Sequence, residues 1–203
     1  MFIFGILIHE LGHLIGGIVS GYHFLFLEVL GIMLERRNGK FKLKRVPMVS
    51  LGQCIMYHEN VDKCAIPLVT GGIILNAVFG IAFIVLFFLG RSFWFVVRIL
   101  FLSSGLANMS LALINLFGSK TSDGVTLKEI LYSNGQMKLY NTIMLAYSYM
   151  DIENESIEIP DELAKKLRKL VLDCEDEGRN TGLMEEAFMI LKRRKNGFSG
   201  ESV

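Results

Sequence analysis

The residues best suited to chemistry lie near the amino terminus, in the sequence His9-Glu10-Leu11-Gly12-His13. Residues four apart lie on one face of a helix, so both imidazoles can bind one zinc ion at about 2.0–2.1 Å each. Glu10 is placed beside them to take a proton from a water molecule at the metal. The H-E-x-x-H pattern therefore predicts a zinc hydrolase, with His9 and His13 as metal ligands and Glu10 as general base.

Two histidines do not complete a catalytic zinc site, which usually has three protein ligands and a water. The third ligand should be an Asp, Glu or His near another helix. Asn76 and Asn115 are polar residues of the other apolar segments, but amides are poor zinc ligands. Asp123 lies just past the last apolar segment and is followed by a glycine that allows a tight turn. We therefore predict Asp123 as the third ligand.

The segments around these residues are unusually apolar. Hydrophobic residues make up 52% of the 203-residue chain, which is high for a soluble domain. Residues 65–89 and 99–118 contain no charged residue, and about 20 apolar residues suffice to span a bilayer. The first 22 residues are also apolar apart from the motif, and polar groups in such a segment are expensive in lipid unless they have partners.

An apolar amino-terminal segment can also be a signal peptide. This one lacks a basic start and is interrupted by the charge of its motif. We therefore predict a mainly α, polytopic protein of the cell membrane, with three transmembrane helices over about 1–22, 65–89 and 95–118.

The loop between the first two spans predicts a β-hairpin and the orientation of the chain. Asn38-Gly39 is a strong hairpin turn signal between two strand-like runs, which places the hairpin at about 29–46. Its free edge could pair with an extended peptide, or the hairpin could have a purely structural role. The loop carries seven Lys and Arg against four acids, so the positive-inside rule places 23–64 in the cytoplasm. Two further crossings place 119–203 there as well.

The residues after Gly124 predict a small helical cytoplasmic tail of unknown role. Its helices are expected at about 124–150, 160–177 and 181–196, with a break over 154–160. We divide the chain into an intramembrane core, 1–124, and this tail, 125–203. The three cysteines fall on the predicted cytoplasmic side, where thiols stay reduced.

These residues resemble the site-2 protease family of intramembrane zinc metalloproteases. That family has H-E-x-x-H in its first core helix and an aspartate ligand in a later N-x-x-P-x-x-x-x-D-G motif. Residues 115–124 match that motif at Asn115, Asp123 and Gly124 with the spacing kept, while Gly118 stands in place of the proline. Residues 72–76 are similar to the family's G-P-x-x-N element, with Ile73 in place of the proline.

The resemblance covers about 1–124, including a loop at 46–52 similar to the one that follows the family's membrane-associated hairpin. It implies zinc bound by His9, His13 and Asp123, and a substrate-binding role for Asn76. It implies a membrane-embedded protein or peptide as the substrate, cleaved within or near a transmembrane segment. Because only 90–92 separate the second and third spans, the chain is similar to a minimal form without an inserted peptide-binding domain.

Two other functions are compatible with these residues. A non-catalytic membrane protein could keep the zinc site for structure or substrate capture, although such a site has no use for Glu10. A small metal transporter could use intramembrane His and Asp ligands, but transporters usually have repeated halves and the sequence has none. A basic stripe with interleaved aromatic residues, typical of nucleic-acid binding, is not present.

Overall fold

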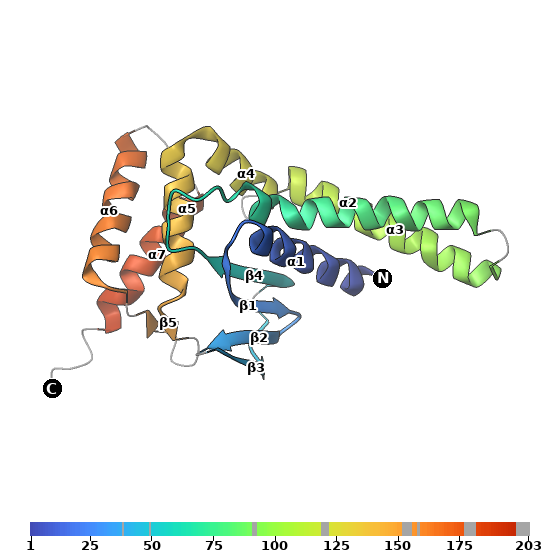
Figure 1. The fold of residues 1–203 in the computed structure, drawn as a ribbon, viewed down its shortest axis with the longest axis horizontal. Helices are drawn as coiled ribbons and strands as arrows, with labels where there is room; N and C mark the ends of the chain where they lie inside the picture. Colours follow the sequence, from blue (N-terminus) through green and yellow to red (C-terminus); the bar gives the residue numbers. More distant parts are fainter. Residues whose placement is uncertain are drawn as a thin grey trace.

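The computed structural model describes residues 1–37, 39–48, 50–90, 93–118, 122–151, 156–157, 159–176 and 182–197. Three of its helices are long and apolar enough to cross a membrane, by length and composition: α1 (Phe2–Val19), α2 (Ile66–Leu89) and α3 (Phe95–Phe117). This confirms the three predicted segments to within a few residues. The α2–α3 hairpin extends beyond α1 at one end of an elongated molecule (Figure 1). Arg91 and Ser92 of its predicted turn lie outside the described residues.

The outer surfaces of α2 and α3 remain apolar. Side chains such as Ile74, Val78 and Ile81 of α2, and Leu113 and Ile114 of α3, are more than half exposed. A soluble protein rarely exposes so continuous an apolar surface. Contact with lipid tails would cover it.

A four-stranded antiparallel sheet lies along α1. It contains β1 (His23–Val29), β2 (Ile32–Arg37), β3 (Lys40–Arg45) and β4 (Gly52–Tyr57), in the order β3-β2-β1-β4. The predicted hairpin is confirmed as β2–β3, with Leu34 opposite Leu43. Gly39 has a φ of 75° in the turn, a conformation that glycine adopts readily, whereas Asn38 lies outside the described residues. The sheet is larger than predicted because β1 pairs with both β2 and β4.

The remaining elements form the helical tail. They are α4 (Asp123–Tyr132), α5 (Asn134–Tyr147), β5 (Met150–Asp151), β6 (Ser156–Ile157), α6 (Asp161–Asp176) and α7 (Gly182–Gly197). The prediction of one helix over 124–150 was wrong. Ser133 has an extended backbone (φ −146°, ψ 153°), and its hydroxyl accepts a hydrogen bond of 3.2 Å from the Gln136 N–H. Ser133 therefore caps a second helix instead of continuing the first.

One hydrophobic core connects the tail to the rest of the chain. Met56 of β4, Leu68 of α2, and Leu139 and Ile143 of α5 belong to the same cluster and are almost fully buried. In Figure 1, α4 leads from the α1–α2 end of the membrane helices to α5, and α6 and α7 lie beyond it. The tail is thus packed against the elements that carry the candidate site.

Candidate metal centre

The site begins with a close crossing of α1 and α2. A Cβ atom on Gly12 would collide with the Gly71 carbonyl, one on Gly71 with the Gly12 carbonyl, and one on Gly16 with the Pro67 carbonyl. Small residues of this kind allow two membrane helices to bring their backbones into contact. Because Gly12 adjoins His13, the crossing presses the histidine face of α1 against the first turns of α2.

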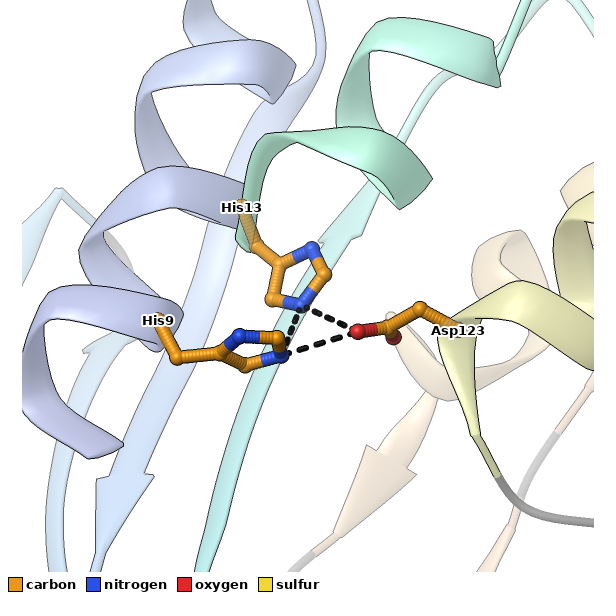
Figure 2. A group of neighbouring side chains, drawn as sticks. All are labelled: His9, His13 and Asp123. Atoms are coloured by element: carbon orange, nitrogen blue, oxygen red, sulfur yellow. Dashed lines mark hydrogen bonds and ion pairs between the residues drawn. The ribbon is translucent and has the colours of Figure 1, made fainter. Parts of the chain in front are cut away.

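The three predicted metal ligands converge at this crossing (Figure 2). The Asp123 Oδ2 atom lies 2.8 Å from His9 Nε2 and 3.3 Å from His13 Nε2. The two Nε2 atoms are 3.1 Å apart. Ligand atoms in a tetrahedral zinc site lie about 3.3–3.4 Å from one another when each bond is about 2.0–2.1 Å. The observed triangle is therefore close in size to the face of a zinc tetrahedron.

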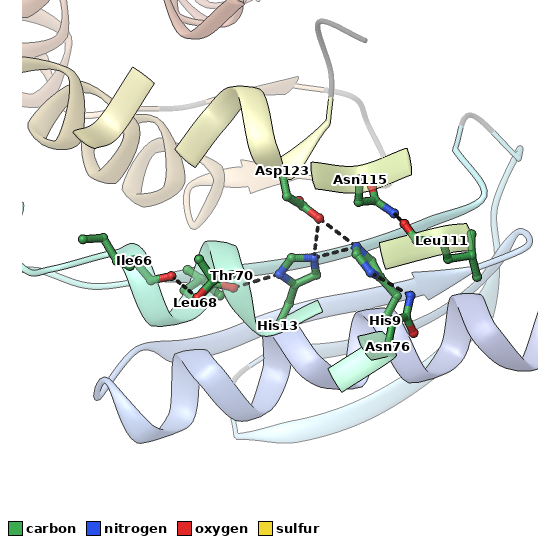
Figure 3. Close-up of polar contacts among 9 residues, drawn as sticks. All are labelled: His9, His13, Ile66, Leu68, Thr70, Asn76, Leu111, Asn115 and Asp123. Carbon is green, nitrogen blue, oxygen red and sulfur yellow. Dashed lines mark hydrogen bonds and ion pairs between the residues drawn. The ribbon is translucent and has the colours of Figure 1, made fainter. Parts of the chain in front are cut away.

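His13 is held with its Nε2 directed at the centre. Its Nδ1 lies 2.8 Å from the Leu68 carbonyl oxygen (Figure 3). A carbonyl only accepts hydrogen bonds, so Nδ1 carries the proton. In the neutral ring this leaves a lone pair on Nε2, which is the form that binds a metal.

Asn76 holds His9 from the other side. Its side chain is completely buried, and its Nδ2 lies 3.2 Å from His9 Nδ1 (Figure 3). An amide can donate to a ring nitrogen or, after a half-turn, accept from a ring N–H. Accepting from Nδ1–H leaves the lone pair on Nε2, as metal binding requires. The predicted contact between Asn76 and a substrate stays a prediction, and the partner that the structure gives the amide is His9.

Removal of this amide should weaken metal binding. We expect Asn76→Leu to lower zinc affinity by roughly 10–100-fold, as is usual when the partner of a histidine ligand is lost. Zinc titration of the detergent-purified protein against a competing chelator measures the effect. Asn108→Leu is the matched control, since Asn108 is also completely buried but donates to Ser104 O within its own helix. Equal zinc affinity of the wild type and Asn76→Leu would refute the role assigned to Asn76.

Asp123 supplies the negative charge of the site. It is the first residue of α4, after Ser122 with its extended backbone. Burial raises the pKa of Asp123. When the two rings carry a proton on Nε2 instead of a metal, the hydrogen bonds from His13 and His9 and their positive charge outweigh burial, and the net pKa is well below the usual value. Asp123 is therefore ionised at neutral pH and available to a cation.

The centre also contains space for a metal because residue 72 is a glycine and has no side chain. An ideal Cβ on Gly72 would lie 2.6 Å from His13 Nε2 and 2.7 Å from His9 Nε2. Glycine at this position leaves the tips of both imidazoles free to converge. Two histidines, one carboxylate and this open space fit a divalent transition metal, and the N,N,O donor set suits zinc.

The centre opens into a cavity of about 730 Å³. Glu10, a buried residue of α1, lines it together with the three ligands. A Cβ on Gly52 of β4 would lie 2.5 Å from Glu10 Oε1, so this strand leaves space for the carboxylate. The arrangement places an acid beside a metal-ligand triad in a space large enough for part of a peptide.

The sequence did not indicate two of the cavity's walls. One is β4, which contributes Gly52 to Ile55, whereas the β2–β3 hairpin contributes none of the described lining residues. The other comes from the tail, through α5 and α7. Neither wall carries a local motif, so only the long-range packing of the chain places them at the site.

Comparisons with known proteins leave the family assignment untested. No model of a protein family matches the chain, and no curated protein or solved structure matches it either.

Proposed function

We propose that this chain is a zinc-dependent protease that hydrolyses a peptide bond within or near a transmembrane segment of a membrane-bound protein or peptide. One observation carries the proposal. His9 and His13 of α1 meet Asp123, more than a hundred residues later in the chain, with Glu10 lining the same cavity. These groups are the ligands and the general base that metal-assisted peptide hydrolysis requires.

Each residue has a distinct role in this proposal. His9, His13 and Asp123 would hold the zinc ion. When bound, zinc supplies Lewis acidity that activates a water and polarises the scissile carbonyl. Glu10 takes the proton from the attacking water and then delivers it to the leaving amine nitrogen. Leu68 and Asn76 keep the two imidazoles in orientation.

The substrate segment must be extended when it reaches the site, because a helix hides its carbonyls in its own hydrogen bonds. β4 is an edge strand of the sheet and borders the cavity. An edge strand can bind an extended peptide through main-chain hydrogen bonds. We assign this role to β4 rather than to the outer strand β3 of the hairpin.

We also propose a multi-pass cell-membrane protein with residues 23–64 and 119–203 in the cytoplasm. The excess of basic residues in the first loop supports this orientation. The candidate centre lies near the beginning of α2, which directly follows the first of these segments, and its ligand Asp123 belongs to the second. Water would then reach the site from the cytoplasmic side.

The non-catalytic and transporter alternatives do not explain why Glu10 is buried at the site. A site used only for structure, substrate capture or metal transport gives Glu10 no function, yet Glu10 is buried and lines the same cavity as the three ligands. A buried carboxylate is retained at a cost unless it has a role. This observation favours the protease.

The metal part of the proposal is tested at Asp123. We expect Asp123→Ala to lose zinc, because two histidines without the carboxylate leave the site incomplete. Metal analysis of purified protein by mass spectrometry measures the zinc-to-protein ratio, which should be near one for the wild type. Asp123→Asn keeps the shape of the side chain without its charge, so its loss of zinc separates ligation from folding.

The control for this experiment is Asp173→Ala, which changes an exposed aspartate of α6. It should bind zinc like the wild type. Cleavage of membrane-embedded peptides by the wild type in proteoliposomes should stop on chelation and return with added zinc. Full zinc binding by both Asp123 variants would mean that another residue is the third ligand.

A further inference from the structure

The helical tail forms one wall of the cavity that holds the candidate metal centre. Tyr140 and Met144 of α5, and Leu183 and Glu186 of α7, line it together with the metal ligands. Tyr140 is near enough to both Asp123 and Glu186 for their negative charges to raise the pKa of its hydroxyl, although burial is the larger cause. The tail thus faces the space that the proposed substrate would enter.

We propose that this wall is a side-chain-binding subsite in which Glu186 binds a lysine or arginine of the substrate close to the scissile bond. The inference rests on the proposed protease function and deepens it by naming a substrate class. The subsite consists of Glu186, Tyr140, Met144 and Leu183.

The chemistry of Glu186 favours a cationic ligand. Its Oε1 accepts a hydrogen bond of 2.7 Å from the Tyr147 hydroxyl, which orients the carboxylate. The ion pairs found among the described residues do not include Glu186. Burial raises the pKa of Glu186, and the nearby charge of Glu129 raises it further. A cation entering the cavity would stabilise the ionised carboxylate in these surroundings.

The charged residues that line the cavity also favour a cationic ligand. Its described lining contains Glu10, Asp123 and Glu186 but no lysine or arginine. The two histidines that line it are occupied with the metal centre. The two positive charges of a bound zinc ion would offset Glu10 and Asp123, which leaves Glu186 as the acid of the described lining that can pair with a positively charged substrate side chain.

The subsite is held in place by the helix that carries a metal ligand. Glu129 lies on α4, which begins at Asp123, and its Oε1 accepts a hydrogen bond of 3.1 Å from the Gly182 N–H. This contact satisfies a free N–H at the first turn of α7 and places negative charge at its positive end. The helix α4 thus links the metal ligand Asp123 to the first turn of α7, the helix that carries Glu186.

The proposed substrate carries the matching charge in the right place. Transmembrane segments are flanked by lysine and arginine on the cytoplasmic side. The candidate centre includes Asp123, the first residue of α4, and α4 leads from the membrane helices to the tail (Figure 1). A substrate span reaching this centre would bring its flanking basic residue to the tail. Met144 and Leu183 can cover the aliphatic part of that side chain while Glu186 binds its charged end.

The test compares two series of synthetic transmembrane peptides in proteoliposomes with the full-length, zinc-loaded protein. In one series a single lysine is placed in turn at each position around the cytoplasmic end of the apolar segment. In the other series norleucine replaces that lysine. We expect the wild type to cleave the best lysine peptide with a kcat/KM roughly 10–100-fold above its norleucine partner, the value of a charge-assisted hydrogen bond.

Variants of α7 test whether Glu186 causes the preference for lysine over norleucine. Glu186→Gln should bring the lysine-to-norleucine ratio close to one, and Glu186→Lys should favour a glutamate at the same position. Glu185→Gln, which changes the adjacent exposed acid of α7, should keep the wild-type ratio. Circular dichroism and zinc content confirm that each variant is folded and loaded.

The outcomes separate the two proposals. Cleavage of both series by the wild type without preference, or a preference that survives Glu186→Gln, overturns the subsite and leaves the protease function standing. A zinc-loaded wild type that cleaves neither series overturns the protease function, and the subsite with it.

Discussion

Glu10→Gln is expected to abolish peptide cleavage while zinc remains bound. The glutamine amide cannot take a proton from the attacking water, and loss of a general base typically lowers the rate by about 10²–10⁴. Zinc should be retained because the three converging ligand atoms belong to His9, His13 and Asp123. Measuring the zinc-to-protein ratio and the cleavage rate on the same preparation tests both parts.

The control for Glu10→Gln is Glu162→Gln, which changes an exposed acid of α6 that does not line the cavity. It should cleave peptides at the wild-type rate. Cleavage by zinc-loaded Glu10→Gln at the wild-type rate would show that Glu10 is not the base. If zinc-loaded wild type and Glu10→Gln both lack activity on every membrane peptide, the non-catalytic alternative gains support.

The sequence predicted the features of the fold that depend on local composition. The three apolar helices follow from long uncharged segments, and the hairpin β2–β3 follows from alternating residues around an Asn-Gly turn. Both signals are short-range, because helix length and side-chain alternation are properties of the segment itself. Pairing of β1 with β4 was not predictable in the same way, since these strands are separated by the whole hairpin.

In the candidate site, too, contacts within one helix could be predicted from the sequence, whereas most contacts between distant segments could not. His9 and His13 are one helical turn apart, so their proximity follows from the helix alone. Asp123 was predicted because few residues in or beside the other apolar segments could bind zinc, and the structure brings its carboxylate to both imidazoles. The positions of Tyr140 and Glu186 depend on how α4 turns at Ser133 and how α7 packs on α5. No local sequence pattern indicates either contact.

The groups that orient His9 and His13 could be predicted from the sequence only in part. Asn76 was chosen by resemblance as a substrate-binding residue, while its completely buried amide contacts His9. The Leu68 carbonyl that orients His13 could not be identified from its side chain, because the backbone makes the contact. Such partners become visible only when the crossing of α1 and α2 is known.

Gly72→Ala adds only one methyl group but is expected to destroy the metal centre. The new methyl carbon would lie 2.6–2.7 Å from the Nε2 atoms of His13 and His9, well inside van der Waals contact. Metal sites require their ligands to be held within about 0.5 Å of the productive geometry. The methyl group should push both imidazole tips apart and weaken zinc binding by more than about 100-fold, the upper end for changes outside the ligands themselves.

The fold should survive this substitution better than the site, because the methyl mainly meets the ends of side chains that can rotate away. Gly80→Ala is the matched control on the same helix. Its Cβ would meet the Met109 side chain at 2.7 Å and the Met109 backbone nitrogen at 3.1 Å, and none of these nearest contacts is a metal ligand. Circular dichroism should show both variants to be helical, while zinc titration should show loss in Gly72→Ala alone. Wild-type zinc affinity in Gly72→Ala would mean that the metal is held elsewhere and that the convergence of His9, His13 and Asp123 is not the centre of this protein's chemistry.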